Sequence, residues 1–298
     1  MPLLLPGLGV LLGLMVGSFL NVVIYRLPLM MEREWRQQCV ALSPAGTAAA
    51  ADEPAATDEP FNLMRPRSAC PKCGTPIKAR HNVPVFGWLW LRGRCAHCQA
   101  PISVRYPLVE AATGLLSGFV AWHFGATPDA LAALLLTWAL IALAMIDLDH
   151  HLLPDAITLP LLWAGLLYHL VDAPHSAGSP FTNLSDGVIG ALAGYLSLWL
   201  VYHGFRLVTG KEGMGFGDFK LFAALGAWLG WQMLPLIILL SAFTGAVIGI
   251  AMIALGRHGR QVPIPFGPYL AAAGFVALLW GPALMSAYFR TAGLPVPS

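Results

Sequence analysis

Four cysteines of this sequence form two close pairs that are typical of a zinc site. Cys70 and Cys73 make one CxxC motif, and Cys95 and Cys98 make a second one after twenty-one intervening residues. Each pair places two thiolates on one tight turn, and two such turns complete the tetrahedral sulfur shell of structural Zn2+. Because four sulfurs leave no open coordination position, we expect the metal to fold a small module and not to catalyse. The alternative is a set of reduced thiols without metal.

A second group of candidate residues consists of acids at the ends of apolar segments. They are Asp147, Asp149, Asp155 and Asp218. Charged side chains in such places are costly and by default face a protein-lined cavity, so they mark functional sites. Two carboxylates that lie close together cannot both ionise, so one keeps its proton, and the pair can activate a water molecule and protonate a leaving amine. That is the chemistry of aspartyl peptide hydrolysis.

Spacing alone leaves open which acids form the pair. Asp147 and Asp149 are two residues apart and point in different directions on a helix, so only one of them can serve a shared site. Asp155 fits a helix N-cap better than a catalytic role, and an N-cap is also the alternative for Asp218. For Asp147 the alternative is a charged helix end at the membrane surface. Three further polar residues keep open roles: Glu110, His150 and His151.

Composition identifies the environment of these residues as a lipid bilayer. The chain has 298 residues, of which 57% are hydrophobic and only 11% are charged, whereas about a quarter of the residues in a soluble domain carry charge. A water-soluble globule is therefore excluded. The net charge of +2 gives no field strong enough to recruit nucleic acid, so we expect no nucleic-acid partner.

Runs of about 20 apolar residues can each cross a membrane as a helix. The sequence contains eight candidates, and it predicts an all-α polytopic membrane protein with about eight transmembrane helices and a small cytoplasmic zinc-ribbon-like module. The expected spans are residues 3–25, 106–124, 130–147, 155–171, 187–208, 218–231, 233–255 and 266–288. The sixth is short and rich in glycine, which fits a tilted or partial span.

Basic residues assign the sides of the membrane and the domains. Eleven of the seventeen Lys and Arg residues lie in 26–105, so the positive-inside rule places this segment in the cytoplasm and both termini outside. We expect an N-terminal anchor at 1–25, a cytoplasmic domain at 26–105 and a helix bundle at 106–298. Within the cytoplasmic domain, a disordered insert at 43–60 alternates Ala, Pro and acidic residues and precedes the four-cysteine module at 61–105.

This topology places acids from distant parts of the chain at one membrane depth. Asp147 ends the third expected span and Asp218 begins the sixth, both on the cytoplasmic side. A pair of carboxylates from two different helices is therefore geometrically possible. The run Pro-Phe-Gly-Pro-Tyr-Leu at 265–270 begins the eighth span. It fits either a groove for an extended peptide or a helix N-terminus with Pro in its first turn.

Four motifs together resemble the type IV prepilin peptidases. They are the CxxC pairs and the runs GSFLNVVIYRLP at 17–28, IDLDHHLLPD at 146–155 and TGKEGMGFGDFK at 209–220. In this order they are far more specific than a GxGD motif alone. The resemblance covers nearly the whole chain and implies an inner-membrane aspartyl protease of the GxGD type. Such enzymes cut the basic leader from type IV prepilins and type II secretion pseudopilins on the cytoplasmic side.

The resemblance also implies site residues, cofactors and partners. By motif, the catalytic pair is Asp147 and Asp218. Many members of the family methylate the new N-terminal residue with S-adenosyl-L-methionine, and the four-cysteine module accompanies the bifunctional members. No glycine-rich loop follows a strand here, so the sequence itself shows no site for this cofactor. The implied partners are prepilin or pseudopilin substrates and the lipid bilayer, and the oligomeric state stays open.

A proton- or cation-coupled secondary transporter is the alternative function. In a transporter, Asp147, Asp218 and Glu110 would carry protons or cations through the bundle. Against this alternative, the informative acids other than Glu110 gather at one membrane face, and a transporter needs no cysteine-rich module. A scaffold whose zinc module docks a partner is a third hypothesis, and it leaves the paired acids unexplained.

Overall fold

Helices make up nearly all of the regular structure in the computed structural model, which describes residues 4–42, 61–171, 179–255 and 264–293. The expected insert at 43–60 lies outside the described residues. Apart from isolated β-bridges, the described chain contains no β-structure. It divides into two compact units, Gly7–Gly118 and, with the first few residues, Phe119–Ser298. Each unit has its own internal packing.

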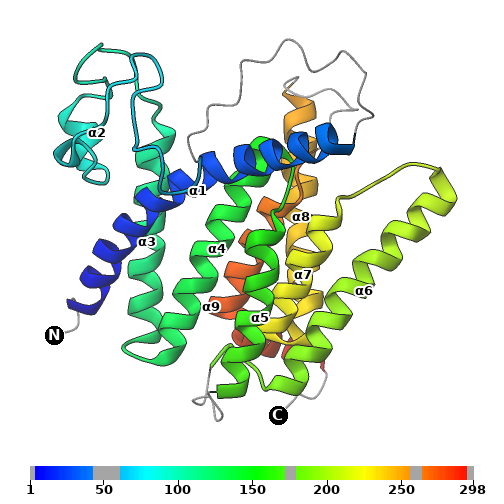
Figure 1. Ribbon diagram of the computed structural model, residues 1–298. Helices are drawn as coiled ribbons and strands as arrows, with labels where there is room; N and C mark the ends of the chain where they lie inside the picture. Colours follow the sequence, from blue (N-terminus) through cyan, green and yellow to red (C-terminus); the bar gives the residue numbers. More distant parts are fainter. Residues whose placement is uncertain (1–3, 43–60, 172–178, 256–263, 294–298) are drawn as a thin grey trace. The chain divides into compact units, whose positions relative to one another are not determined.

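Eight helices of the described chain coincide with the eight expected apolar segments (Figure 1). They are α1 (Leu4–Leu42), α3 (Arg105–Phe124), α4 (Pro128–His150), α5 (Asp155–Val171), α6 (Leu184–Thr209), α7 (Phe216–Leu229), α8 (Leu234–Ala254) and α9 (Gly267–Thr291). The shorter elements are η2 (Ala79–His81), α2 (Phe86–Trp90) and η3 (Trp231–Met233). The all-α prediction is therefore confirmed for the described residues.

Five helical segments of the described chain, not eight, are long and apolar enough to cross a membrane. They are Leu4–Leu42, Pro128–His150, Leu184–Thr209, Trp231–Ala254 and Gly267–Thr291. Helix α5 has 17 residues and α7 has 14, so they are only about 26 Å and 21 Å long at the α-helical rise. The hydrocarbon core is about 30 Å thick. The chain is thus a polytopic membrane protein with five candidate spans in the described residues.

In the unit Gly7–Gly118, α1 and α3 are in backbone contact. A Cβ atom at Gly13 would lie 2.4 Å from Ser117 Oγ, and one at Gly17 would lie 2.8 Å from the Cα atom of Glu110. These glycines let the two helices approach closely, as small residues do in membrane proteins. The Gly17 of the N-terminal motif therefore has a packing role.

Helix α1 continues well beyond the expected span end at residue 25. It reaches Leu42 and contains Pro28, and Figure 1 shows a bend along its course. A proline inside a helix removes one backbone hydrogen bond and is a usual cause of such bends. The buried Arg26 donates hydrogen bonds to the carbonyl oxygens of Asn62 at 2.9 Å and Pro66 at 2.6 Å. Arg26 thereby attaches the start of the segment that carries the cysteines to α1.

In the unit Phe119–Ser298, helix α7 occupies the centre of a helix bundle. It packs against α5, α6, α8 and α9. Every residue from 221 to 230 is buried, and these residues are all apolar or glycine. The short α7 is therefore apolar because protein surrounds it. Its first turn carries Asp218.

Glycines set the distance between α6 and α7. A Cβ atom at Gly190 of α6 would lie 2.3 Å from the carbonyl oxygen of Gly226 in α7, and one at Gly226 would lie 2.2 Å from the carbonyl oxygen of Gly190. Real Cβ contacts essentially never come this close, so any side chain here must push the two helices apart.

Substitution of Gly190 by Ala should destabilise the protein. The added methyl group meets backbone that cannot rotate away, so the free energy of unfolding should fall by about 1–3 kcal/mol, as in other overpacked cores. Gly204→Ala on the same helix is the matched control, because no atom lies within 4 Å of its Cβ position. The measurement is the thermal unfolding midpoint of the detergent-purified variants. Equal midpoints for the two variants would contradict the close α6–α7 contact.

Candidate functional site

Asp147 lies in the last turn of α4 and is buried, with 6% of its surface exposed. The helix ends because His151 adopts a left-handed conformation with a φ of 52° and donates its N–H to the carbonyl oxygen of Asp147 at 2.9 Å. The alternative of a solvated charge at a helix end is wrong for this residue. The side chain points into protein and not into water.

Asp218 lies in the first turn of α7 and is also buried, with 8% exposed. The helix begins at Phe216, and Gly215 holds the N-cap position without a side-chain cap. The N–H of Asp218 donates to the carbonyl oxygen of Gly215 at 3.3 Å. Asp218 is therefore not itself the N-cap, and its carboxylate accepts the N–H of Gly215 at the start of the same helix.

The start of α9 contributes a direct contact with Asp147. The N–H of Gly267 donates to Asp147 Oδ2 at 3.0 Å, and a Cβ atom at Gly267 would lie 2.7 Å from the same oxygen. Helix N-termini carry unpaired N–H groups and partial positive charge, both of which favour a carboxylate. The run 265–270 therefore begins a helix, as one of its two interpretations held, and its glycine also orients the acid. The sequence interpretation missed this partner.

Leu153 joins the helix ends that carry the two acids. A Cβ atom at Gly217, next to Asp218, would lie 2.7 Å from Leu153 Cβ, and one at Gly267 would lie 3.2 Å from Leu153 Cδ2. The end of α4, the start of α7 and the start of α9 therefore meet at one place. The carboxylates of Asp147 and Asp218 lie close enough there to interact electrostatically. The structure thus brings together the two acids that the motifs select.

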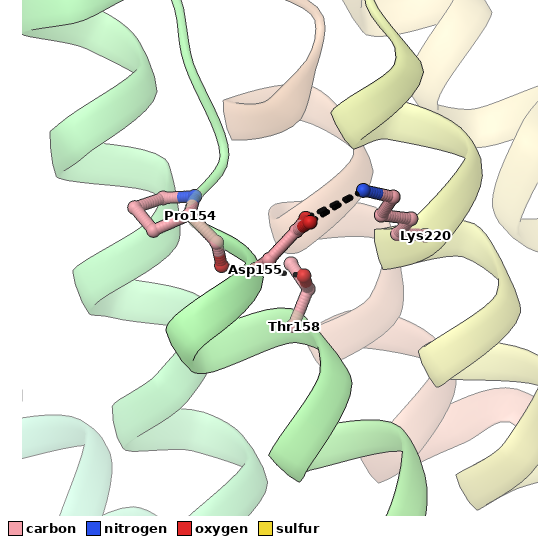
Figure 2. Close-up of polar contacts among 4 residues, drawn as sticks. All are labelled: Pro154, Asp155, Thr158 and Lys220. Carbon is pink, nitrogen blue, oxygen red and sulfur yellow. Dashed lines mark hydrogen bonds and ion pairs between the residues drawn. The ribbon is translucent and has the colours of Figure 1, made fainter. Parts of the chain in front are cut away.

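An ion pair lies beside this meeting point. Lys220 Nζ donates to both carboxylate oxygens of Asp155, each at 2.7 Å, and Figure 2 shows the pair between the first turns of α5 and α7. Asp155 is the first residue of α5, and the Thr158 hydroxyl donates to the carbonyl oxygen of Pro154 at 3.2 Å. The N-cap prediction for Asp155 is wrong: its carboxylate binds a lysine from another helix. Partly exposed pairs of this kind contribute about 0–1 kcal/mol to stability.

The remaining polar candidates differ from the two acids in burial or in the unit that contains them. The side chains at positions 149–151 are exposed. Burial therefore distinguishes Asp147 from Asp149, which their spacing in the sequence could not do. Glu110 belongs to the unit Gly7–Gly118, where its Oε2 accepts the N–H of Val85 at 2.7 Å. Its role is to hold the segment before α2 against α3.

The four cysteines lie on two similar turns. The N–H of Gly74 donates to the carbonyl oxygen of Cys70 at 2.9 Å, and the N–H of Gln99 donates to that of Cys95 at 3.0 Å. Gly74 and Gln99 both have a positive φ. Antiparallel bridges flank each turn, between residues 69 and 76 and between residues 94 and 101. The second CxxC therefore repeats the local geometry of the first.

The sulfur positions fit a tetrahedral metal. All four Sγ atoms lie within 4.8 Å of one another, and Cys70 Sγ and Cys98 Sγ are 3.8 Å apart. A tetrahedron with Zn–S bonds of about 2.3 Å has sulfurs about 3.8 Å apart. The hydrogen bond with the Thr75 hydroxyl lowers the pKa of the Cys73 thiol to about 6, which favours the thiolate that binds metals. This cluster can hold a metal ion.

Comparison with known proteins connects these features. The bacterial peptidase A24 N-terminal domain matches residues 11–124, and the type IV leader peptidase family matches residues 134–250. The prepilin leader peptidase/N-methyltransferase of Aeromonas hydrophila is 56% identical over 97% of this chain and 95% of its own length. The chain belongs to the type IV leader peptidase family. This membership removes the support for the transporter alternative.

Two further relatives with the same name come from other species. The Aeromonas salmonicida protein is 55% identical over 98% of this chain and 96% of its own. The Pseudomonas aeruginosa protein is 54% identical over 95% and 93% of the two chains. No solved structure matches this chain. The leader peptidase family is therefore identified from full-length sequence similarity.

Substitution of Gly267 by Ala should abolish most of the peptidase activity of this family member. The new methyl group would overlap Asp147 Oδ2 and displace it, and displacement of a catalytic group by about 1 Å can lower rates about 100-fold. We expect kcat in a leader-cleavage assay to fall by about that factor. Gly281→Ala on the same helix is the control, because its Cβ position meets only the flexible Met233 side chain at under 3.8 Å. Equal activity of both variants would contradict the role of Gly267.

Proposed function

We propose that this chain cleaves the leader peptide of type IV prepilins and type II secretion pseudopilins and then N-methylates the new N-terminal residue. In this proposal Asp147 and Asp218 are the catalytic pair. The observation that carries it is the meeting of two buried carboxylates from α4 and α7 at one end of a helix bundle. Family membership and the name of the relatives, prepilin leader peptidase/N-methyltransferase, support the same reactions.

The acid pair acts through one shared proton. Two carboxylates in close contact hold a single proton between them, because both cannot be ionised together. The ionised acid takes a proton from a water molecule, and the resulting hydroxide attacks the carbonyl carbon of the scissile peptide bond. The protonated acid then supplies a proton to the leaving amine, and the C–N bond breaks. The products are the leader carboxylate and a new N-terminal amine.

In this proposal the scissile bond of the substrate and the two acids lie at the same depth in the membrane. A prepilin is an apolar helix with a positive leader, so it lies in the bilayer with its scissile bond at the interface. The acids lie at the end of the candidate span α4 and at the start of α7. The proposed location is the bacterial inner membrane, with the eight apolar helices arranged so that this end faces the cytoplasm. The excess of basic residues in 26–105 supports that orientation.

The four-cysteine cluster is proposed to bind structural zinc. Cys70, Cys73, Cys95 and Cys98 supply four thiolates at tetrahedral spacing, and thiolates at two CxxC turns are the ligands that Zn2+ prefers. With all four positions taken by protein, the metal holds the two turns together and takes no part in cleavage. The described cysteines are free thiols, as expected for a module that is cytoplasmic in the proposed topology.

Methyl transfer is proposed from family membership alone. S-adenosyl-L-methionine supplies the methyl group in that reaction, and the name of the relatives includes the N-methyltransferase activity. No described residue is assigned to hold this group, and no step of the transfer is assigned to a side chain. The transfer follows cleavage, because the amine that accepts the methyl group exists only after the peptide bond breaks.

Replacement of either acid by its amide should abolish leader cleavage. Asp147→Asn and Asp218→Asn keep the side-chain size but remove the carboxyl group that shares the proton, so a loss of about 10³-fold or more is expected in a prepilin cleavage assay. Asp149→Asn is the matched control, because Asp149 is an exposed acid on the same helix as Asp147. Methyl transfer to a pre-cut substrate should persist in both variants. Full cleavage by either amide variant would refute the catalytic pair.

Metal analysis should find about one zinc per chain in the purified protein. Cys70→Ser and Cys98→Ser should each lower the zinc content and the thermal unfolding midpoint, since metal binding supplies folding energy to such modules. Cys39→Ser is the control, because Cys39 lies on α1 outside the cluster, and it should keep its zinc. A stable, metal-free preparation of the unmodified protein would contradict the zinc site.

A further inference from the structure

Glycines at positions 215 and 217 leave the start of α7 with few side chains to hold it in place. Gly215 occupies the N-cap position without a side-chain cap, and the preceding residues 211–213 are exposed. Glycine loses more conformational freedom on folding than other residues, so this helix start costs more to order. This turn nevertheless carries Asp218, whose position the proposed chemistry requires to be accurate.

Two contacts connect this turn to the α4–α5 connection. Gly217 packs against Leu153, since a Cβ atom at Gly217 would lie only 2.7 Å from Leu153 Cβ. Three residues along α7, Lys220 donates to both oxygens of Asp155 at 2.7 Å (Figure 2). The first contact is apolar and has no preferred direction. The second is a charge-assisted pair with two hydrogen bonds, which fixes orientation as well as distance.

Lys220 does not act on Asp218 from the same face of the helix. Residues two apart on an α-helix point in different directions, and the Lys220 amine is bound to Asp155 on α5. The effect of Lys220 that we consider on the acid pair therefore passes through the backbone of the first turn. Asp155 in turn follows Leu153, which reaches the Gly267 position beside Asp147. The ion pair thus lies between the elements that carry the two acids.

We propose that the Asp155–Lys220 ion pair fixes the first turn of α7 so that Asp218 meets Asp147, which makes Asp155 and Lys220 positioning residues for the acid pair. This inference rests on the proposed function, because it assigns them to the same site. Neither residue touches the scissile bond in this scheme. The pair connects the start of α7 to a neighbouring helix.

Loss of either charge should lower the rate of cleavage and leave substrate binding unchanged. For Lys220→Met and Asp155→Asn, we expect kcat for prepilin cleavage to fall roughly 10- to 100-fold, since small displacements of catalytic groups have effects of this size. KM should stay within about twofold. The unfolding midpoint should stay near that of the unmodified protein, because the rest of α7 is buried and partly exposed pairs add little stability. Lys220→Arg should retain most of the activity, because Arg can donate two hydrogen bonds to one carboxylate.

A charge swap gives the decisive comparison. The double variant Asp155→Lys, Lys220→Asp reverses the pair while keeping one long and one short side chain. If positioning is the role, the swap should recover kcat to within about threefold of the unmodified protein, whereas the single variants stay low. Arg36→Met is the matched control, because the Glu32–Arg36 pair on α1 has the same 2.7 Å distance. This control should leave kcat unchanged.

The inference is overturned if Lys220→Met keeps full kcat, if the swap is as slow as the single variants, or if the unfolding midpoint falls in parallel with kcat. The second result would mean that Lys220 acts by its own charge, and the third that the pair is only structural. Failure of the proposed function looks different. In that case the unmodified protein does not cut a prepilin, or Asp218→Asn cuts it at full rate, and the positioning roles fall with it.

Discussion

Two carboxylates buried at one end of an apolar bundle are the constraint on which the rest of the structure depends. Asp147 and Asp218 would each be expensive to ionise without a compensating donor, and the N–H of Gly267 supplies one to Asp147. The same burial makes the acids useful, because charges interact more strongly where water is excluded. The elements at this end of the bundle therefore have to approach the acids closely and also supply them with polar contacts.

Glycine residues let the helices around the acids approach their neighbours closely. Gly267 lets α9 reach Asp147, and Gly217 lets α7 rest on Leu153. Further along α7, the Gly190–Gly226 contact draws α6 against the same helix. A helix that is enclosed in this way need not be long enough to cross a membrane. That is why a 14-residue helix can carry a buried acid at one end of the bundle.

Hydropathy predicted where the helices lie, but not how many of them face lipid. All eight apolar segments are helical in the described chain, yet α7 is apolar because protein surrounds it, and composition does not distinguish the two environments. The extension of α1 to Leu42 was missed for the opposite reason, since residues 29–42 mix charged and apolar side chains. The cysteine cluster was the easiest part to predict, because a CxxC turn is a local structure.

The acid site was predicted only as far as local rules reach. Motif resemblance selected Asp147 over Asp149, and the burial of the first and exposure of the second agree with that choice. Asp155 was assigned to a cap because an acid after proline at a helix start favours one, whereas its real partner, Lys220, lies 65 residues away. Gly267 lies 120 residues from Asp147 and contacts it through its backbone N–H. Because every residue except proline has such a group, the sequence does not predict this contact. The acids of such a site can thus be predicted from the sequence. The backbone and packing contacts that orient those acids become visible only in the folded chain.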